Sequence, residues 1–183
     1  MRDTKTEILH FWFEETDPVQ WFQKNPEFDR LIADRFGTTV QMAREGLCDR
    51  WADDSDGALS LCIVLDQFPR NIFRDQPESF ASDEKALRVA RQAIRSGFDQ
   101  VQVPIRRRFF YLPFEDSETI EDQNRAVELF SAMREDDPMG YEYALRHRDV
   151  IARFGRFPHR NAILGRETSA EEKAYLSQPG AGF

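Results

Sequence analysis

Hydrophobic residues recur every three to four positions along most of the chain, and alternating runs of β-branched residues are almost absent. Phe28, Ile32 and Phe36, for instance, have the spacing of one helix face. The segment 58–68 (ALSLCIVLDQF) is nearly all apolar, which is typical of a helix buried on several sides. The pattern predicts an all-α protein.

Capping signals mark the starts of several expected helices. Asp17, Asn25 and Asp137 each precede a proline, and proline favours the first position of a helix. Thr4, Thr168 and Ser169 are each followed three residues later by glutamate, which is the capping-box pattern. Ser82 is a further expected N-cap.

Other residues indicate where helices end. Gly155 is expected to terminate a helix, because glycine adopts the left-handed conformation of a helix C-terminus. Pro69 and Pro113 are expected to end the helices that precede them, since proline has no N–H group. A new helix is then expected to start from a cap at Asp116 or Ser117.

These signals predict about eight or nine helices joined by short turns. The chain has no long linker and no low-complexity tract, and no repeat with a period near 34 residues is visible. Residues 1–183 are therefore predicted to form a single domain.

Composition limits the classes of partner. A net charge of −8 argues against general affinity for nucleic acid, and no stretch approaches the roughly 18 apolar residues of a membrane span. Cys48 and Cys62 both lie in apolar helical contexts, and the N-terminus has no apolar signal segment. We expect a cytoplasmic protein with unlinked thiols, and the sequence leaves its oligomeric state open.

Positive charge is concentrated in two places in this acidic chain. Residues 146–166 contain six arginines and one acid, Asp149. Arg106, Arg107 and Arg108 form a second basic cluster. Such clustering needs an explanation beyond a general preference for arginine.

Two segments, 65–73 (LDQFPRNIF) and 154–163 (FGRFPHRNAI), share a Phe-Pro turn followed by arginine and asparagine. They are predicted to be counterparts that meet across a shared pocket, with acids supplied by 111–118 (YLPFEDSE). The candidate ligand-binding residues are Asp66, Arg70, Asn71, Glu115, Asp116, Glu118, His147, Arg156, His159, Arg160 and Asn161.

The preferred function is binding of an anionic small molecule or a peptide carboxylate, because the arginine fork suits both groups. In that case at least two arginines of the turns should form salt bridges with acids of the first and third segments, or with a bound anion. The expected pairs join Arg70, Arg156 or Arg160 to Asp66, Glu115 or Glu118.

Two other functions stay open. One is a hydrolase in which His147 or His159 acts as general acid or base, oriented by Asp66 or Glu118. The other is a purely structural or interaction module whose arginines only lock the turns. No metal site is expected, because the His-Glu-x-x-His spacing is absent and nearby arginines repel cations, and no cofactor motif is present.

The segments LDQFPRNIFR, RRFFYLPFEDSE and RHRDVIARFGRFPHRNAILGRE, with the terminal ILHFWFEE and YLSQPGAGF, resemble an uncharacterised bacterial family of unknown function. The resemblance covers nearly the whole chain. It implies a TPR-like bundle of antiparallel helices and no established activity. This chain has Asp116 where the family has histidine, which removes one histidine from the candidate site.

Overall fold

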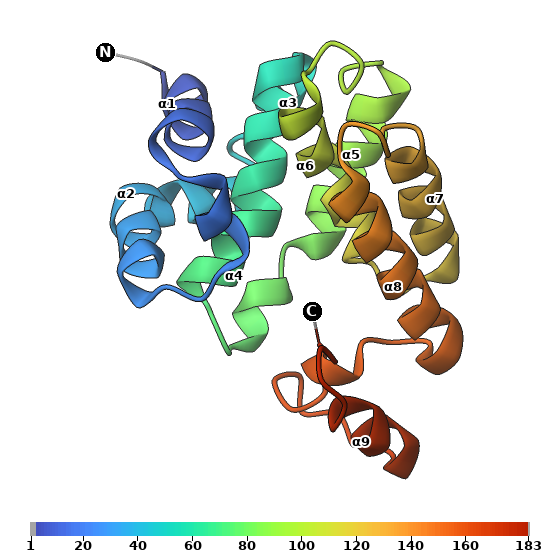
Figure 1. Cartoon of the computed structure of the whole chain (residues 1–183). Helices are drawn as coiled ribbons and strands as arrows, with labels where there is room; N and C mark the ends of the chain where they lie inside the picture. The colour runs from blue at the N-terminus through green and yellow to red at the C-terminus, as the bar shows by residue number, and fades with distance from the viewer. Residues whose placement is uncertain (1–2, 183) are drawn as a thin grey trace. The chain divides into compact units, whose positions relative to one another are not determined.

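The computed structural model describes residues 3–182, and helical segments hold 71% of them (Figure 1). No β-strand occurs in this range. The all-α class predicted from the hydrophobic spacing is therefore confirmed, whereas the TPR-like arrangement stays a prediction. None of the helices within 3–182 combines the length and the apolar character needed to cross a bilayer.

Internal contacts divide the chain into two compact units. Unit 1 consists of Met1–Arg74 and Glu78–Pro113, and unit 2 consists of Asp75–Pro77 and Phe114–Phe183. The second boundary falls inside helix α6 (Pro104–Glu115). The expectation of one domain stays a prediction.

The core of unit 1 is built around the apolar helix α3 (Ser55–Cys62), which packs against α1 and α5. Side chains from Ala58 to Leu65 are fully buried, as the all-apolar run predicts. Cys48 and Cys62 are buried and unlinked. The other segments up to α6 are α1 (Thr4–His10), the π-helix η1 (Phe11–Glu15), the 3-10 helix η2 (Pro18–Phe22), α2 (Pro26–Arg44), η3 (Asp49–Asp53), the π-helix η4 (Ile63–Gln67), α4 (Phe68–Ile72), η5 (Pro77–Phe80) and α5 (Asp83–Arg95).

Side-chain caps mark the starts of η2 and α2 in unit 1. Asp17 accepts a hydrogen bond from the Val19 N–H and forms a capping box with Gln20. The side chain of Asn25 accepts hydrogen bonds from the backbone at the start of α2. These two predicted caps are confirmed, because each needs only residues within one turn. The cap predicted at Thr4 is wrong, since the N-cap of α1 is Asp3.

The prediction that Pro69 ends its helix is wrong. The chain stays helical through the π-helix η4 and then α4, which has Pro69 in its first turn. Pro69 cannot donate to the Leu65 carbonyl four residues earlier, and the hydroxyl of Ser82 donates to that carbonyl instead, at 2.7 Å. Ser82 does occupy the N-cap position of α5, but its side chain makes no capping hydrogen bond there.

In unit 2, helices α7 (Ile120–Ser131) and α8 (Pro138–Phe154) lie side by side (Figure 1). They are followed by the 3-10 turn η6 (Pro158–Arg160) and by α9 (Ala170–Leu176). The predicted cap of α8 at Asp137 is confirmed, and of the two caps predicted for α9 it is Ser169 and not Thr168 that forms the capping box. Gly155 ends α8 in the left-handed conformation, as predicted.

Two expectations around the start of unit 2 are wrong. Helix α6 does not stop at Pro113 but reaches Glu115. The amide of Gln123 donates to the carbonyls of Glu115 and Ser117, at 2.6 and 2.7 Å, and so satisfies groups at this helix end. The N-cap of α7 is Thr119.

Candidate functional site

The first Phe-Pro turn places Asp66 and Arg70 one helical turn apart. The Asp66 carboxylate is buried and accepts a hydrogen bond of 2.6 Å from Gln67. Arg70 lies 3.6 Å from Asp66 and donates two hydrogen bonds of 2.8 Å to Asp83. Arg70 is therefore within reach of Asp66, as predicted, but Asp83 binds it more closely.

Asn71 belongs to a second cluster in unit 1. Its amide donates to Asp29 at 2.8 Å, and Arg74 donates two hydrogen bonds of 2.7 Å to the same carboxylate. Sequence reasoning missed Asp29 and Arg74 as partners of this turn. Asp29 lies in the first turn of α2, 42 residues away, and no local pattern could have indicated the contact.

In unit 2, Arg160 forms a nearly buried ion pair with Asp116. Its guanidinium donates to the Asp116 carboxylate at 2.6 Å and to the Asp116 carbonyl at 3.0 Å. It also lies 4.5 Å from the centroid of the Phe157 ring, and the arginine side chain is 7% exposed. Asp116 is thus an internal counter-ion for Arg160.

Arg156 pairs with a carboxylate outside the predicted set. It donates two hydrogen bonds to Glu172 of α9, at 2.7 and 2.9 Å. Hydrogen bonds from Arg156 and from the Ser169 N–H lower the pKa of Glu172 to about 2. This pair connects Arg156, two residues after the end of α8, to the capping box of α9.

Glu118 accepts hydrogen bonds from both a side chain and the backbone. Arg166 donates to its two oxygens at 2.7 and 3.0 Å, and the Phe157 N–H donates at 2.8 Å. Burial by itself would raise the pKa of Glu118, but these hydrogen bonds outweigh it and leave the pKa below its ordinary value. Arg166 was not among the candidate site residues.

The histidine that shares the α8 face with Ile151 points inward, as predicted. His147 is 11% exposed, and its Nδ1 lies 3.1 Å from Glu115 and 2.8 Å from the Tyr143 carbonyl. Burial lowers the pKa of His147 to about 4, so the imidazole is neutral near pH 7. Two oxygen acceptors at Nδ1 favour the tautomer that carries its proton there.

His159 and Asn161 complete the predicted residues of unit 2. Burial, and then the nearby positive charge of Arg160, lower the pKa of His159 to about 4. The Asn161 side chain is fully buried, and its Oδ1 has no hydrogen-bond partner among the described residues. Asn71 and Asn161 belong to different units, so their predicted meeting across a shared pocket stays a prediction.

The arginines of both Phe-Pro turns are therefore compensated by carboxylates of their own unit. Arg70 is bound by Asp83, Arg160 by Asp116 and Arg156 by Glu172. The acids offset the positive charge that the sequence concentrates here, and the pairs hold turns and helix ends together. Across residues 3–182, His, Cys, Asp and Glu side chains form no group of three or more that could bind a metal ion.

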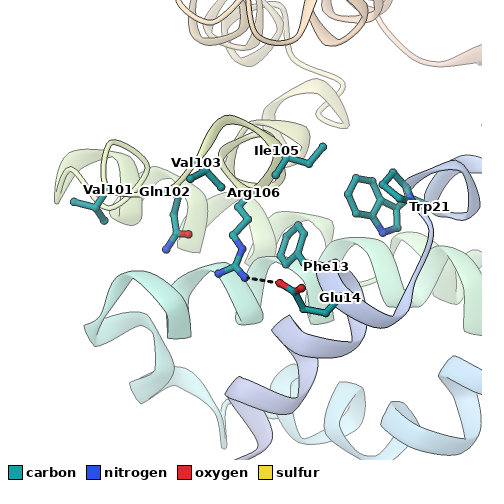
Figure 2. Close-up of a pocket in the computed structure, with 9 residues that line it drawn as sticks. Phe13, Glu14, Trp21, Val101, Gln102, Val103, Ile105 and Arg106 are labelled. Atoms are coloured by element: carbon teal, nitrogen blue, oxygen red, sulfur yellow. Dashed lines mark ion pairs between the residues drawn. The ribbon is translucent and has the colours of Figure 1, made fainter.

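A pocket in unit 1 contains none of the predicted site residues. It has a volume of about 480 Å³ and lies beside η1, η2 and the start of α6 (Figure 2). Its lining residues are Phe13, Glu14, Pro18, Trp21, Val101, Gln102, Val103, Ile105 and Arg106. The sequence signal that could have found it is the basic cluster at Arg106, Arg107 and Arg108.

Arg106 differs from the arginines of the turns. Figure 2 shows its side chain reaching from α6 toward Glu14, beside Phe13. Its guanidinium forms an ion pair of 3.5 Å with Glu14 and lies 5.0 Å from the centroid of the Phe13 ring. No acceptor within residues 3–182 receives a hydrogen bond from this guanidinium. Its N–H donors therefore remain available to a ligand.

Comparison with known proteins identifies the family of this chain and a solved structure that is similar to it. The family model described as "Bacterial protein of unknown function (DUF924)" matches residues 8–180. The solved structure of the protein of unknown function ATU0120 from Agrobacterium tumefaciens is 41% identical and has a TM-score of 0.90. The match covers 94% of this chain and 96% of that one. No curated protein matches the chain.

Proposed function

We propose a ligand-binding function for this chain, which belongs to the bacterial family of unknown function DUF924. The ligand is a small organic anion, either a free molecule or the carboxylate of a peptide, and Arg106 binds it. One observation carries the proposal: Arg106 lines a pocket and donates no hydrogen bond to an acceptor within residues 3–182. Such a planar fork of donors suits a carboxylate.

The sequence predicts the same class of ligand at the Phe-Pro turns, but the contacts there favour a structural role. An anion at Arg160 or Arg156 would compete with a carboxylate that already makes close hydrogen bonds to it. Leaving Asp116 or Glu172 without its partner would cost free energy. The pocket at Arg106 carries no such penalty.

Glu14 is a weak competitor for Arg106. Its side chain is 58% exposed, and the ion pair is 3.5 Å long. Exposed pairs of this kind contribute about 0–1 kcal/mol, so a ligand carboxylate can displace Glu14 or bind next to it at small cost. Removing the Glu14 charge should therefore strengthen anion binding.

A hydrolase that uses His147 is a second candidate. The distance of 3.1 Å between its Nδ1 and Glu115 supports this function, because a carboxylate can orient the imidazole of a general base. A pKa of about 4, however, makes His147 a weak base near neutral pH. Binding at Arg106 is the better supported function.

The test is calorimetric titration of the whole chain with acetate, hexanoate, benzoate, inorganic phosphate and sulfate. We expect at least one anion to bind, Arg106→Gln to abolish that binding, and Arg106→Lys to retain part of it because the charge remains. Glu14→Gln should tighten binding several-fold.

Three results would overturn the proposal. They are the absence of binding by any anion, binding that survives in Arg106→Gln, and binding that Glu14→Gln weakens. Binding lost only in Arg156→Gln and Arg160→Gln would move the site to the Phe-Pro turns.

A further inference from the structure

We infer that the ligand of the Arg106 pocket is a monocarboxylate carried on an apolar body, such as an aliphatic chain or an aromatic ring. This inference rests on the proposed function and adds the chemical class of the ligand. Arg106 supplies the positive charge of the pocket, and six of the nine residues that line it are apolar.

The apolar lining includes side chains that the fold leaves in solvent. Val101, Val103 and Ile105 are 73%, 56% and 46% exposed, and all three line the pocket. Phe13 and Trp21 contribute aromatic rings from η1 and η2. Clustered exposed apolar residues around a concave site mark a binding surface for apolar groups.

This lining is held in place before any ligand binds. Gln102, between the two valines, donates hydrogen bonds of 2.8 and 2.7 Å to Ser55 and Asp56. The Gln102 carbonyl in turn accepts a hydrogen bond of 3.1 Å from Arg107. A pre-formed wall reduces the entropy lost on binding.

Trp21 is fixed as well. Its indole N–H donates to the Trp12 carbonyl at 3.0 Å, and its ring stacks on Trp12 with centroids 5.8 Å apart. It also meets the Phe109 ring edge-on at 5.0 Å. The ring can therefore serve as a rigid wall for an aliphatic or aromatic group.

The charge of the pocket favours a single negative charge on the ligand. Arg106 is the one cationic residue among the residues that line it, and Glu14 is the one acid. A dianion such as phosphate would place its second charge close to Glu14 without a second counter-ion. A carboxylate needs only the guanidinium, and its apolar body covers the valines.

The experiment is a calorimetric titration with acetate, butyrate, hexanoate and octanoate, with 1-octanol as the uncharged control. Affinity should rise about two- to fourfold per added methylene, which corresponds to at most the ~0.8 kcal/mol expected for a buried CH₂. Octanoate should bind at least tenfold more tightly than 1-octanol, and Arg106→Gln should remove that difference.

A matched pair of variants tests the apolar wall. Val103→Ser should flatten the dependence on chain length, and serine suits this position because it directly precedes Pro104, the first residue of α6. Leu47→Ser is the control, since Leu47 is also exposed but does not line the pocket. It should leave the dependence unchanged.

The outcomes separate this inference from the proposed function. If acetate and octanoate bind with equal affinity and both need Arg106, the inference of an apolar body on the ligand is wrong. The proposal that Arg106 binds an anion then still stands. If Val103→Ser and Leu47→Ser change the dependence of affinity on chain length equally, the inference that Val103 contacts the apolar part of the ligand is also wrong. Absence of binding by every carboxylate would overturn both.

Discussion

The Ser82 hydroxyl donates a hydrogen bond of 2.7 Å to the carbonyl of Leu65, four residues before Pro69, which has no N–H group to donate. The bond joins the start of α5 to the π-helix η4 across 17 residues of sequence. Both groups are buried. The side chain at the N-terminus of α5 thus donates to a backbone carbonyl of η4.

Ser82→Ala should lower the free energy of unfolding by about 1–3 kcal/mol, because it removes a buried hydrogen bond to a backbone carbonyl. Urea denaturation of the whole chain measures this change. The same substitution in a Pro69→Ala background should cost less, since alanine restores an N–H group for Leu65. Equal costs in the two backgrounds would show that the hydroxyl does not replace the missing N–H.

Arg160→Ala should destabilise the chain by on the order of 3 kcal/mol, because it leaves Asp116 partly buried and uncompensated. Chemical denaturation provides the measurement. Arg156→Ala should cost less, because Arg156 is more exposed than Arg160 and the Ser169 N–H still donates to the Glu172 carboxylate after its loss. Removing both charges with Arg160→Met and Asp116→Leu should recover part of the loss, and no recovery would argue against an uncompensated charge as the cause.

The buried histidines should make stability depend on pH. Burial lowers the pKa of His147 from 6.5 to about 4, so the unfolded chain takes up a proton at a higher pH than the folded chain. The free energy of unfolding should fall as the pH drops from about 6.5 to about 4, by at most roughly 3 kcal/mol for this group. Above pH 6.5 both states are neutral at this position, and the contribution vanishes.

Urea titrations at pH 7.5 and at pH 5 should therefore differ less in His147→Asn than in the unsubstituted chain. Asparagine keeps an N–H group close to the position of Nδ1. An NMR titration of the His147 ring protons measures the same pKa directly. A midpoint near 6.5 would contradict the effect of burial.

Two glycines should respond to alanine in opposite directions. Gly37, in the middle of α2, has nothing within 4 Å of where a Cβ would lie, so Gly37→Ala should stabilise the chain by about 0.5–1 kcal/mol. A Cβ at Gly57 would collide with the backbone carbonyl of Trp51, so Gly57→Ala should destabilise it by roughly 1–3 kcal/mol. In thermal unfolding, the melting temperature should rise for Gly37→Ala and fall for Gly57→Ala. Equal shifts would contradict the difference in free space at the two glycines.

Much of the local structure follows from the sequence. The caps at Asp17, Asn25 and Ser169 and the helix end at Gly155 were all predictable. Each depends on hydrogen bonds or backbone torsions within one helical turn. The buried helix at 58–65 was equally visible, because a helix that is apolar all round must be covered on all sides.

Tertiary structure decided the partners of the charged residues. Arg160 meets Asp116 across 44 residues, and Arg156 meets Glu172 across 16. A sequence shows that arginines are clustered, but it does not show which carboxylates approach them. Only the packing of the helices determines those distances. In the folded chain, carboxylates compensate the charge of the arginines at the Phe-Pro turns.

The same reason explains the pocket at Arg106. The Arg106–Arg108 cluster was visible in the sequence, but it was not visible that the Arg106 guanidinium donates no hydrogen bond to an acceptor within residues 3–182. Availability of a guanidinium is a property of its surroundings, which distant segments of the chain supply. The sequence by itself determined the helical class, several caps and the residue types, whereas folding decided which carboxylate each arginine meets, because electrostatic compensation depends on distances in space.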